Sequence, residues 1–395
     1  MFRYIFDVQS IGYDVHSQFT LKVNNMADLT KIKYAQLVPI LLLTIVYSFG
    51  QSPKREVTRD TVFADMLMVD SLGITGADGA ISFPLDKGRS IFMMGDSFLE
   101  PVVNRKRNVN STMINNTFIR IDLADSTHTA LYRGTLSDPD ALLKPITGNP
   151  KEFYWPGHGF ANQGVLHLFM SRFFHVDEGW GFAFSGTDYV RMEQESLKVL
   201  AQKDFPHSNA KDVHYGHSIL TDGGYTYLYG SRMEGENSSL HIARARLNES
   251  TNSLEEYRFH DGKGWTSDPT STSALKGVER SVPEQFSIFK YQGHYVLLMQ
   301  ERNLISGNIF SYISDSPVGP WYNEKLLYHT PEQDRGKDNV FTYNAMAHPQ
   351  YMQDGKLLVS YCVNSLDIPK IHEVDTDYYR PVFIRVPMEI ILERP

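Results

Sequence analysis

The sequence predicts an all-β protein built as a five-bladed β-propeller in a single domain. From residue 58 onward, apolar residues alternate with a period of two, which is typical of β-strands. A hairpin loop that ends in glycine recurs along the chain at intervals of 60 to 76 residues, at Gly88, Gly164, Gly224, Gly293 and Gly355. Repeats of this length suit whole propeller blades and are too long for the single strands of a β-sandwich, which is the alternative architecture.

Each repeat contains an apolar strand after its loop and a third strand further on. The strands after the loops are expected at residues 90–98, 165–174, 225–233, 294–302 and 356–364. The third strands are expected at residues 113–121, 189–192, 240–247, 308–314 and 382–386. Helical spacing is weak and is confined to residues 190–203. Because no linker rich in Pro, Gly or Ser divides the repeats, residues 51–395 are expected to form one domain.

Residues 1–50 have the features of a secretory signal that follows upstream residues. Lys31 and Lys33 precede an apolar run at residues 37–49, which ends in small residues at the spacing of a cleavage site. Met26 is the expected true start of translation. The run is short for a membrane span, so an N-terminal membrane anchor is the weaker interpretation. We therefore expect a secreted or periplasmic bacterial protein with no stable membrane span after cleavage.

Composition excludes several classes of partner. A net charge of −8, a pI near 6.0 and the lack of a Lys/Arg cluster argue against nucleic-acid binding. Cys362 is the only cysteine, which excludes an intrachain disulfide and a cysteine-based metal site. No nucleotide or phosphate fingerprint is present, so no cofactor is expected. A weakly polar ligand such as a carbohydrate fits this composition, and the sequence leaves the oligomeric state open.

Asp78 and Asp96 form the best acid pair in the chain. If Leu85 pairs with Arg89 across the loop of residues 86–88, Asp78 lies opposite Asp96, with Cβ atoms about 4.5–5.5 Å apart. Two close carboxylates acquire separated pKa values, which suits one as an acid and the other as a nucleophile or base. Glycoside hydrolysis uses such a pair. The alternative is that Asp78 caps a turn and Asp96 merely ends a strand.

Further polar residues lie where the strands open on the expected central funnel. Those at strand starts are Trp155, His158, His217, Glu284, Asn344 and His348, and those at strand ends are Arg172, Arg232, Glu301 and Arg302. We predict that they bind substrate, although buried structural histidines and salt-bridged arginines are the alternatives. A metal held by the three histidines is not predicted, because strand starts in different blades are usually too far apart to share one ion.

The runs GADGAISFPLDKGRSIFMMGDSF, YWPGHGFANQGVLHLF and YNAMAHPQYMQDGKLLVSYCVNS resemble a family of secreted bacterial five-bladed propellers of formerly unknown function that includes endo-D-arabinanases. The resemblance covers about residues 60–390. It implies a glycoside hydrolase whose two acidic catalytic positions fall on Asp78 and Asp96. Ser97 replaces the usual Thr, and the long connections at residues 196–213 and 254–279 leave the substrate open.

The function predicted from the sequence is therefore hydrolysis of a polysaccharide or oligosaccharide by two carboxylates, with a furanoside such as arabinan as one candidate. Two alternatives stay open. One is a glycan-binding propeller that has lost turnover, and the other is a polysaccharide lyase that acts on a uronate held by the arginines.

Overall fold

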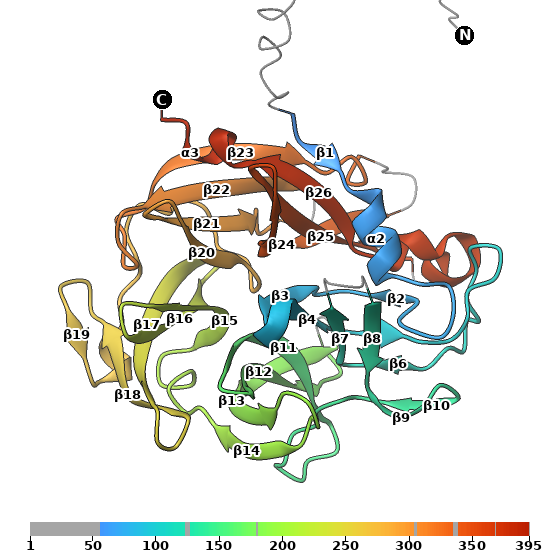
Figure 1. The fold of residues 1–395 in the computed structure, drawn as a ribbon, viewed down its shortest axis with the longest axis horizontal. Helices are drawn as coiled ribbons and strands as arrows, with labels where there is room; N and C mark the ends of the chain where they lie inside the picture. Colours follow the sequence, from blue (N-terminus) through green and yellow to red (C-terminus); the bar gives the residue numbers. More distant parts are fainter. Residues whose placement is uncertain are drawn as a thin grey trace, which may run out of the picture. The chain divides into compact units, whose positions relative to one another are not determined.

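The chain folds into a succession of antiparallel sheets, seen in a computed structural model (Figure 1). The structure describes residues 56–122, 127–178, 181–303, 306–334, 339–367 and 369–394. The expected signal peptide and upstream residues, 1–50, lie outside these ranges.

Five sheets follow one another along the chain, and in each the strands pair mainly in sequence order. The first sheet has the order β3–β4–β7–β8, at Ile81–Pro84, Arg89–Met94, Thr117–Asp122 and Thr127–Leu131. The second is β11–β12–β13–β14, at Glu152–Asn162, Val165–His175, Phe182–Glu193 and Val199–Asp204. The third is β15–β16–β17–β18–β19, at Val213–Asp222, Tyr225–Glu234, Asn237–Asn248, Ser253–His260 and Trp265–Thr266. The fourth is β20–β21–β22–β23, at Ser287–Tyr291, His294–Gln300, Asn308–Ser314 and Tyr322–His329.

The fifth sheet joins the two ends of the described chain. Its order is β24–β25–β26–β1, at Val340–Gln353, Lys356–Ser365, Val382–Pro387 and Thr58–Arg59. The outermost strand β1 thus comes from the start of the described chain and pairs with the end (Figure 1). The remaining elements are the small sheets β2–β5–β6 (Gly76–Ala77, Ser97–Phe98, Met113–Ile114) and β9–β10 (Arg133–Thr135, Asp138–Asp140), and the short helices α2 (Thr61–Leu67), α3 (Met388–Leu392), η1 (Asp86–Gly88), η2 (Pro269–Ser271), η3 (Lys370–Val374) and η4 (Thr376–Tyr379).

The hydrophobic core lies between neighbouring sheets. One apolar cluster fills each junction from the first sheet to the fifth. A further cluster, which contains Phe92 and Ile119 of the first sheet with Leu358 and Phe383 of the fifth, packs these two sheets together. The innermost strands β3, β11, β15, β20 and β24 also contact one another in this order, and β24 contacts β3. Each sheet is therefore buried on both faces, which explains strands as apolar as β4 and β12.

The recurrent loops are hairpin turns, as predicted, and four of them are one residue shorter than the first. The first has three residues, because Leu85 N donates to Arg89 O at 2.8 Å and Gly88 has a φ of +72°. In the others, pairs such as Asn162 with Val165 leave two residues in the turn. Both of these residues have positive φ, which is the requirement of a type I′ turn and explains the glycine at the second position.

The predicted third strands are confirmed, with one interruption. Residues 113–121 divide into β6 and β7, since residues 115 and 116 leave the strand. The weak helix at residues 190–203 is wrong, because this segment forms the end of β13 and the strand β14. As the outermost strand of its sheet, β14 is half-exposed and carries polar residues, so its alternation is weak.

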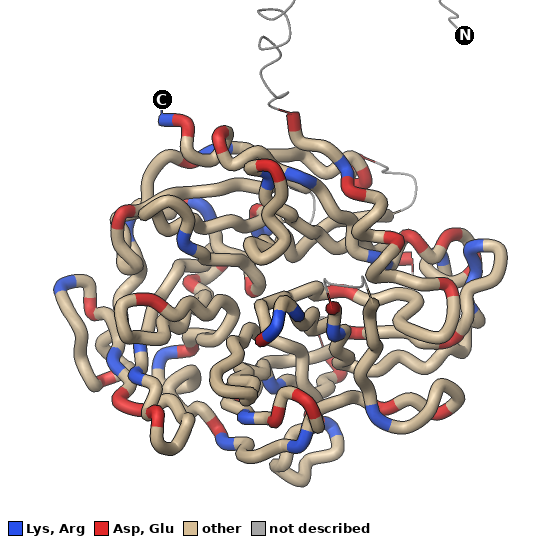
Figure 2. The backbone as a smooth tube through the Cα atoms, in the orientation of Figure 1, with Lys and Arg blue, Asp and Glu red and all other residues tan. Residues whose placement is uncertain are grey.

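The described part of the chain contains no helix that has both the length and the apolar character needed to cross a membrane. Lys and Arg are interspersed with Asp and Glu over the elements (Figure 2).

Candidate functional site

The hairpin register places Asp78 and Asp96 opposite each other, as the sequence predicts. Ile81 pairs with Met93 on one side of the two acids, and Ala77 pairs with Ser97 on the other. Between these pairs, Asp78 N donates to Asp96 O at 3.3 Å. Since paired positions share a face of the ribbon, both carboxylates point to the same side.

Backbone conformation opens space for these acids. Gly79 and Ala80 follow Asp78 with φ of +86° and +51°, so the strand breaks its regular path before β3 begins. Gly95 N donates to Asp78 O at 2.9 Å. A Cβ atom at Gly95 would lie 2.2 Å from Asp78 Oδ1, so glycine is required for the carboxylate to occupy its position.

Each acid accepts hydrogen bonds from a different part of the fold. Asp78 Oδ2 accepts from the Tyr343 hydroxyl of β24 at 2.8 Å. Asp96 Oδ1 accepts from Trp155 Nε1 of β11 at 2.8 Å and from Asn115 Nδ2 at 3.0 Å. Both acids remain partly exposed. Hydrogen bonds from different parts of the fold therefore fix the orientation of the two carboxylates, and solvent still reaches both groups.

The surroundings raise the pKa of both acids. Burial, followed by the negative charge of Asp96, raises the pKa of Asp78 to about 7, against the hydrogen bond from Tyr343. Burial also raises the pKa of Asp96, whereas the hydrogen bonds from Trp155 and Asn115 lower it. In such a pair, one group keeps a proton near neutral pH and the other carries the charge. The two N–H donors on Asp96 favour the charge there, which leaves the proton on Asp78.

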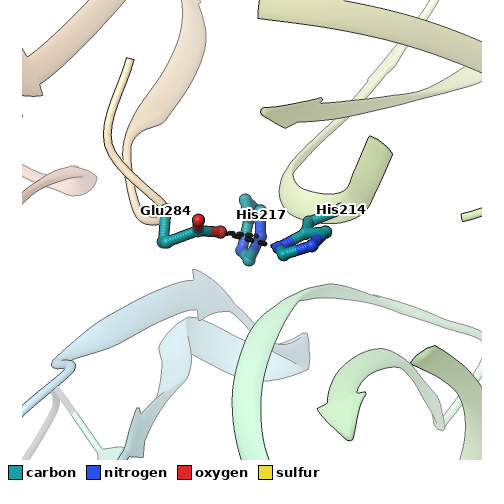
Figure 3. A group of neighbouring side chains, drawn as sticks. All are labelled: His214, His217 and Glu284. Atoms are coloured by element: carbon teal, nitrogen blue, oxygen red, sulfur yellow. Dashed lines mark hydrogen bonds and ion pairs between the residues drawn. The ribbon is translucent and has the colours of Figure 1, made fainter. Parts of the chain in front are cut away.

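A second polar cluster consists of His214, His217 and Glu284 (Figure 3). His214 Nδ1 lies 2.9 Å from Glu284 Oε2, and His217 Nε2 lies 3.4 Å from the same oxygen. Burial lowers the pKa of His217. Burial raises the pKa of Glu284, but the hydrogen bonds and charge of the two histidines outweigh it and hold this pKa well below its usual range.

Both clusters lie at the same end of the innermost strands. Hydrogen bonds join these strands at matching depths, namely Ile288 N to Ser218 Oγ (2.8 Å), Ala347 N to Ser287 Oγ (2.9 Å) and Ser82 Oγ with His348 Nδ1 (2.6 Å). Gln285 Nε2 also donates to Pro156 O at 3.4 Å. Because Gln285 follows Glu284 and Pro156 follows Trp155, this contact links the histidine cluster to the partner of Asp96.

The predicted arginines do not converge on one anion site. Arg172 is buried against Asp188 at 2.6 Å and Asp204 at 2.9 Å. Arg232 bonds the backbone carbonyl of Lys211 and the side chain of Glu234. Arg302 alone approaches a cluster, with its Nη2 atom 3.9 Å from Glu284 Oε1. The salt-bridge interpretation therefore applies to Arg172 and Arg232.

We call the end of the innermost strands at which both clusters lie the mouth. The other predicted residues differ in whether they lie at this mouth or in the interior. His348 is fully buried between Ser82 and Ser360, which is a correction of its expected sugar contact, because no ligand reaches it in this position. His158 Nδ1 accepts from Ile219 N at 3.3 Å, and burial lowers the pKa of His158 to about 4.

Two further predicted residues keep partial exposure. Glu301 is bound by Arg280 at 2.7 Å. Asn344, with a φ of +56°, occupies an irregularity of β24 next to Tyr343.

A cleft of about 560 Å³ lies beside the start of the second sheet. Asn115, Phe153 and His175 line it. Asn115 bonds Asp96 directly, and the charge of His175 lowers the pKa of Asp96. The cleft therefore shares Asn115, a hydrogen-bond donor to Asp96, with the acid pair.

Sequence reasoning missed Tyr343, Asn115 and His214. Tyr343 directly precedes Asn344 and His214 lies three residues before His217, so a wider window on those segments could have included them. Asn115 lies in the gap between β6 and β7, which carries no periodic signal.

Comparison with known proteins identifies the family and the fold. The sequence matches the family described as Domain of unknown function (DUF5005) over residues 60–388. No similarity to a curated protein is found. Among solved structures, the chain is similar to a proposed hydrolase from Bacteroides ovatus ATCC 8483, at 17% identity and a TM-score of 0.69, over 85% of this chain and 92% of that chain. This likeness shows a shared fold.

Weaker similarities are found to two other structures. One is the α-L-arabinofuranosidase PaAbf62A from Podospora anserina, with 13% identity, a TM-score of 0.44, and coverage of 81% of this chain and 94% of that chain. The other is an exo-1,5-α-L-arabinanase from a bovine ruminal metagenomic library, with 12% identity, a TM-score of 0.42, and coverage of 79% and 93%.

Proposed function

We propose that this chain, which belongs to the family described as Domain of unknown function (DUF5005) through residues 60–388, is a glycoside hydrolase that cleaves a polysaccharide or oligosaccharide. The observation that carries the proposal is the pair Asp78 and Asp96, which lie in register, partly exposed and on one side of a ribbon. Hydrolysis of a glycosidic bond needs two carboxyl groups that flank it, one with a raised pKa.

In this proposal the two acids have different roles. Asp78, with its pKa raised to about 7, donates a proton to the leaving oxygen of the glycosidic bond. Asp96, with two N–H donors on one oxygen, acts as the charged carboxylate. It attacks the sugar carbon if configuration is retained, or activates water if it is inverted. Opposed strand positions have Cβ atoms about 4.5–5.5 Å apart, which favours the shorter carboxylate separation of retaining enzymes.

The proposed sugar-binding residues lie beside the two clusters at the ends of the innermost strands. Trp155 and the cleft lined by Phe153 support sugar rings beside Asp96. Arg302 and Glu284 offer hydrogen bonds at the opposite cluster. His348, Arg172 and Arg232 are left out, because their protein partners satisfy them. The resemblance of the motifs around Asp78 and Asp96 to endo-D-arabinanases makes arabinan the first substrate to test.

The proposal includes the architecture and the location of the protein. The five sheets are interpreted as the blades of a five-bladed β-propeller, with β1 in the last blade. Residues 51–395 form the mature protein after cleavage of a signal peptide that begins at Met26, and the protein is secreted or periplasmic. Amino-terminal sequencing of the exported protein tests the cleavage site.

A reducing-end assay on furanoside and pyranoside polymers tests the function. The wild type releases reducing ends from at least one polymer, and Asp78→Asn and Asp96→Asn each lower kcat by about 10²–10⁴-fold. Asp86→Asn, which removes an exposed carboxylate from the loop of the same hairpin, leaves activity unchanged. Activity that survives both catalytic substitutions would refute the proposal.

The same assay separates the alternative functions. A product with an unsaturated ring, detected by its ultraviolet absorbance, would identify a lyase. Glycan binding without any product would identify a binding protein that has lost turnover.

A further inference from the structure

We propose that His214, His217 and Glu284 bind one divalent transition-metal ion of the zinc class at the mouth of the sheets. The donor atoms of these residues lie within 4.8 Å of one another (Figure 3). Two imidazole nitrogens and one carboxylate oxygen are a donor set that suits zinc. The proposal concerns binding of the ion, and its test does not need hydrolase activity.

The spacing of the donors fits one ion. Ligands about 2.0–2.1 Å from a tetrahedral zinc lie about 3.3–3.4 Å from each other. The separations from Glu284 Oε2 are 2.9 Å to His214 Nδ1 and 3.4 Å to His217 Nε2. Both separations from Glu284 Oε2 thus lie within a few tenths of an ångström of this spacing, and the two histidine nitrogens lie within 4.8 Å of each other.

The strand β15 is shaped to bring its two histidines together. Residues three apart in a regular strand face opposite sides of the sheet. Here the register shifts between Tyr215 and Ser218, and Gly216 takes a φ of +98°. A Cβ at Gly216 would lie 2.5 Å from Phe169 Cβ, so only glycine permits this path. As a result, His214 and His217 approach the same carboxylate oxygen.

His217 supplies an independent sign of a missing ligand. The residue is 4% exposed, and among the residues that the structure describes Nε2 has only the 3.4 Å ion-pair contact with Glu284, whereas Nδ1 has no partner. A buried polar group without a partner destabilises the fold, so such groups normally bind a protein group, water or a ligand. A metal ion on Nε2, which points toward Glu284, would satisfy one of the two nitrogens.

Neighbouring side chains contact the proposed ligands and fix their orientation. Phe184 stacks on the His214 ring with centroids 3.6 Å apart. Ser231 Oγ donates to Glu284 Oε2 at 3.4 Å, and Arg302 lies near the other oxygen. Glu284 keeps 38% of its side chain exposed. Three protein ligands leave a fourth position for water or an oxygen of a bound ligand.

Metal analysis of the full chain tests the proposal. The protein is stripped with a chelator, dialysed against zinc chloride and then against buffer, and the bound zinc is measured by mass spectrometry. We expect about one equivalent per chain, which calcium and magnesium do not displace, because these ions prefer oxygen ligands.

Variants identify the ligands. His214→Gln and Glu284→Gln, both at partly exposed positions, should weaken zinc binding at least about 100-fold, since even the loss of an outer partner costs about 10–100-fold. His217→Ala should do the same. The matched control is His294→Gln. His294 lies on β21 and pairs with Asp315, so the variant should retain the ion.

The outcomes distinguish the possibilities. Stoichiometric zinc in the wild type and control, with loss in correctly folded His214→Gln and Glu284→Gln proteins, supports the site. Zinc well below one equivalent, equal retention in the variants, or displacement by calcium would each overturn the proposal and leave the cluster as a hydrogen-bonded network.

Discussion

Replacing Asp78 by asparagine should stabilise the folded protein while it removes activity, and the gain in stability should increase with pH. The carboxyl has an ordinary pKa of 3.8, and the fold raises it to about 7. The folded protein therefore holds this proton over a pH range in which the unfolded chain has released it. Stability from this group is complete below pH 4 and is lost as the pH rises through 7.

The size of the effect follows from the two pKa values. A carboxyl that titrates at 3.8 when unfolded and about 7 when folded costs about 2 kcal/mol of stability at pH 5 and about 4 kcal/mol at pH 8. Asparagine has no charge to bury, and its amide oxygen still accepts from Tyr343. The variant should therefore exceed the wild type by these amounts, with a gap that widens by about 2–3 kcal/mol between pH 5 and pH 8.

Urea unfolding followed by tryptophan fluorescence at the two pH values measures the gap. Asp86→Asn is the control, because it removes an exposed carboxylate from the same hairpin and should show a similar gap at both pH values. Two results would refute the argument that the fold disfavours the charged form of Asp78. One is an Asp78→Asn protein that is no more stable than the wild type at pH 8, and the other is a difference in unfolding free energy from the wild type that is equal at pH 5 and pH 8.

The remaining predictions concern the groups that position the acids. Trp155→Phe removes the hydrogen bond to Asp96, which is worth about 1.5–3 kcal/mol. The pKa of Asp96 should therefore rise, and the acidic limb of the kcat/KM profile should shift to higher pH by about 1–2 units. An unchanged profile would contradict this. Gly95→Ala places a Cβ 2.2 Å from Asp78 Oδ1, so displacement of the carboxylate should lower kcat about 10²-fold. Gly264→Ala, where a Cβ meets no atom within 4 Å, should keep full activity, and equal kcat values for the two variants would exclude this role of Gly95.

The strand pattern and the hairpin register could be read from the sequence because both depend on neighbours along the chain. Apolar runs that follow the hairpin loops identified β12 and β25, and a glycine that ends the loop at Gly88 set the pairing of β3 with β4. The opposition of Asp78 and Asp96 followed from this register alone. Where the pattern was weak, as in the half-exposed strand β14, the sequence wrongly indicated a helix.

The partners of the acids depended on segments that are distant in sequence. Tyr343 reaches Asp78 across 265 positions of the chain, and Trp155 reaches Asp96 across 59. The sequence placed Trp155 at the mouth but gave no reason to pair it with one carboxylate. Similarly, the sequence predicted that Arg172 binds substrate, but Arg172 forms a buried ion pair with Asp188.

The sequence by itself determined the strands that follow each hairpin loop, where these hairpins turn and which two acids face each other, because these features follow from local patterns and turn geometry. The tertiary structure alone decided which side chains meet at the mouth. It buried His348 between two sheets and, through the irregular path of β15, brought His214 and His217 to one oxygen of Glu284. The physical reason is that packing between sheets fixes the depth and direction of each side chain, and these are not encoded in the spacing of residues along one strand.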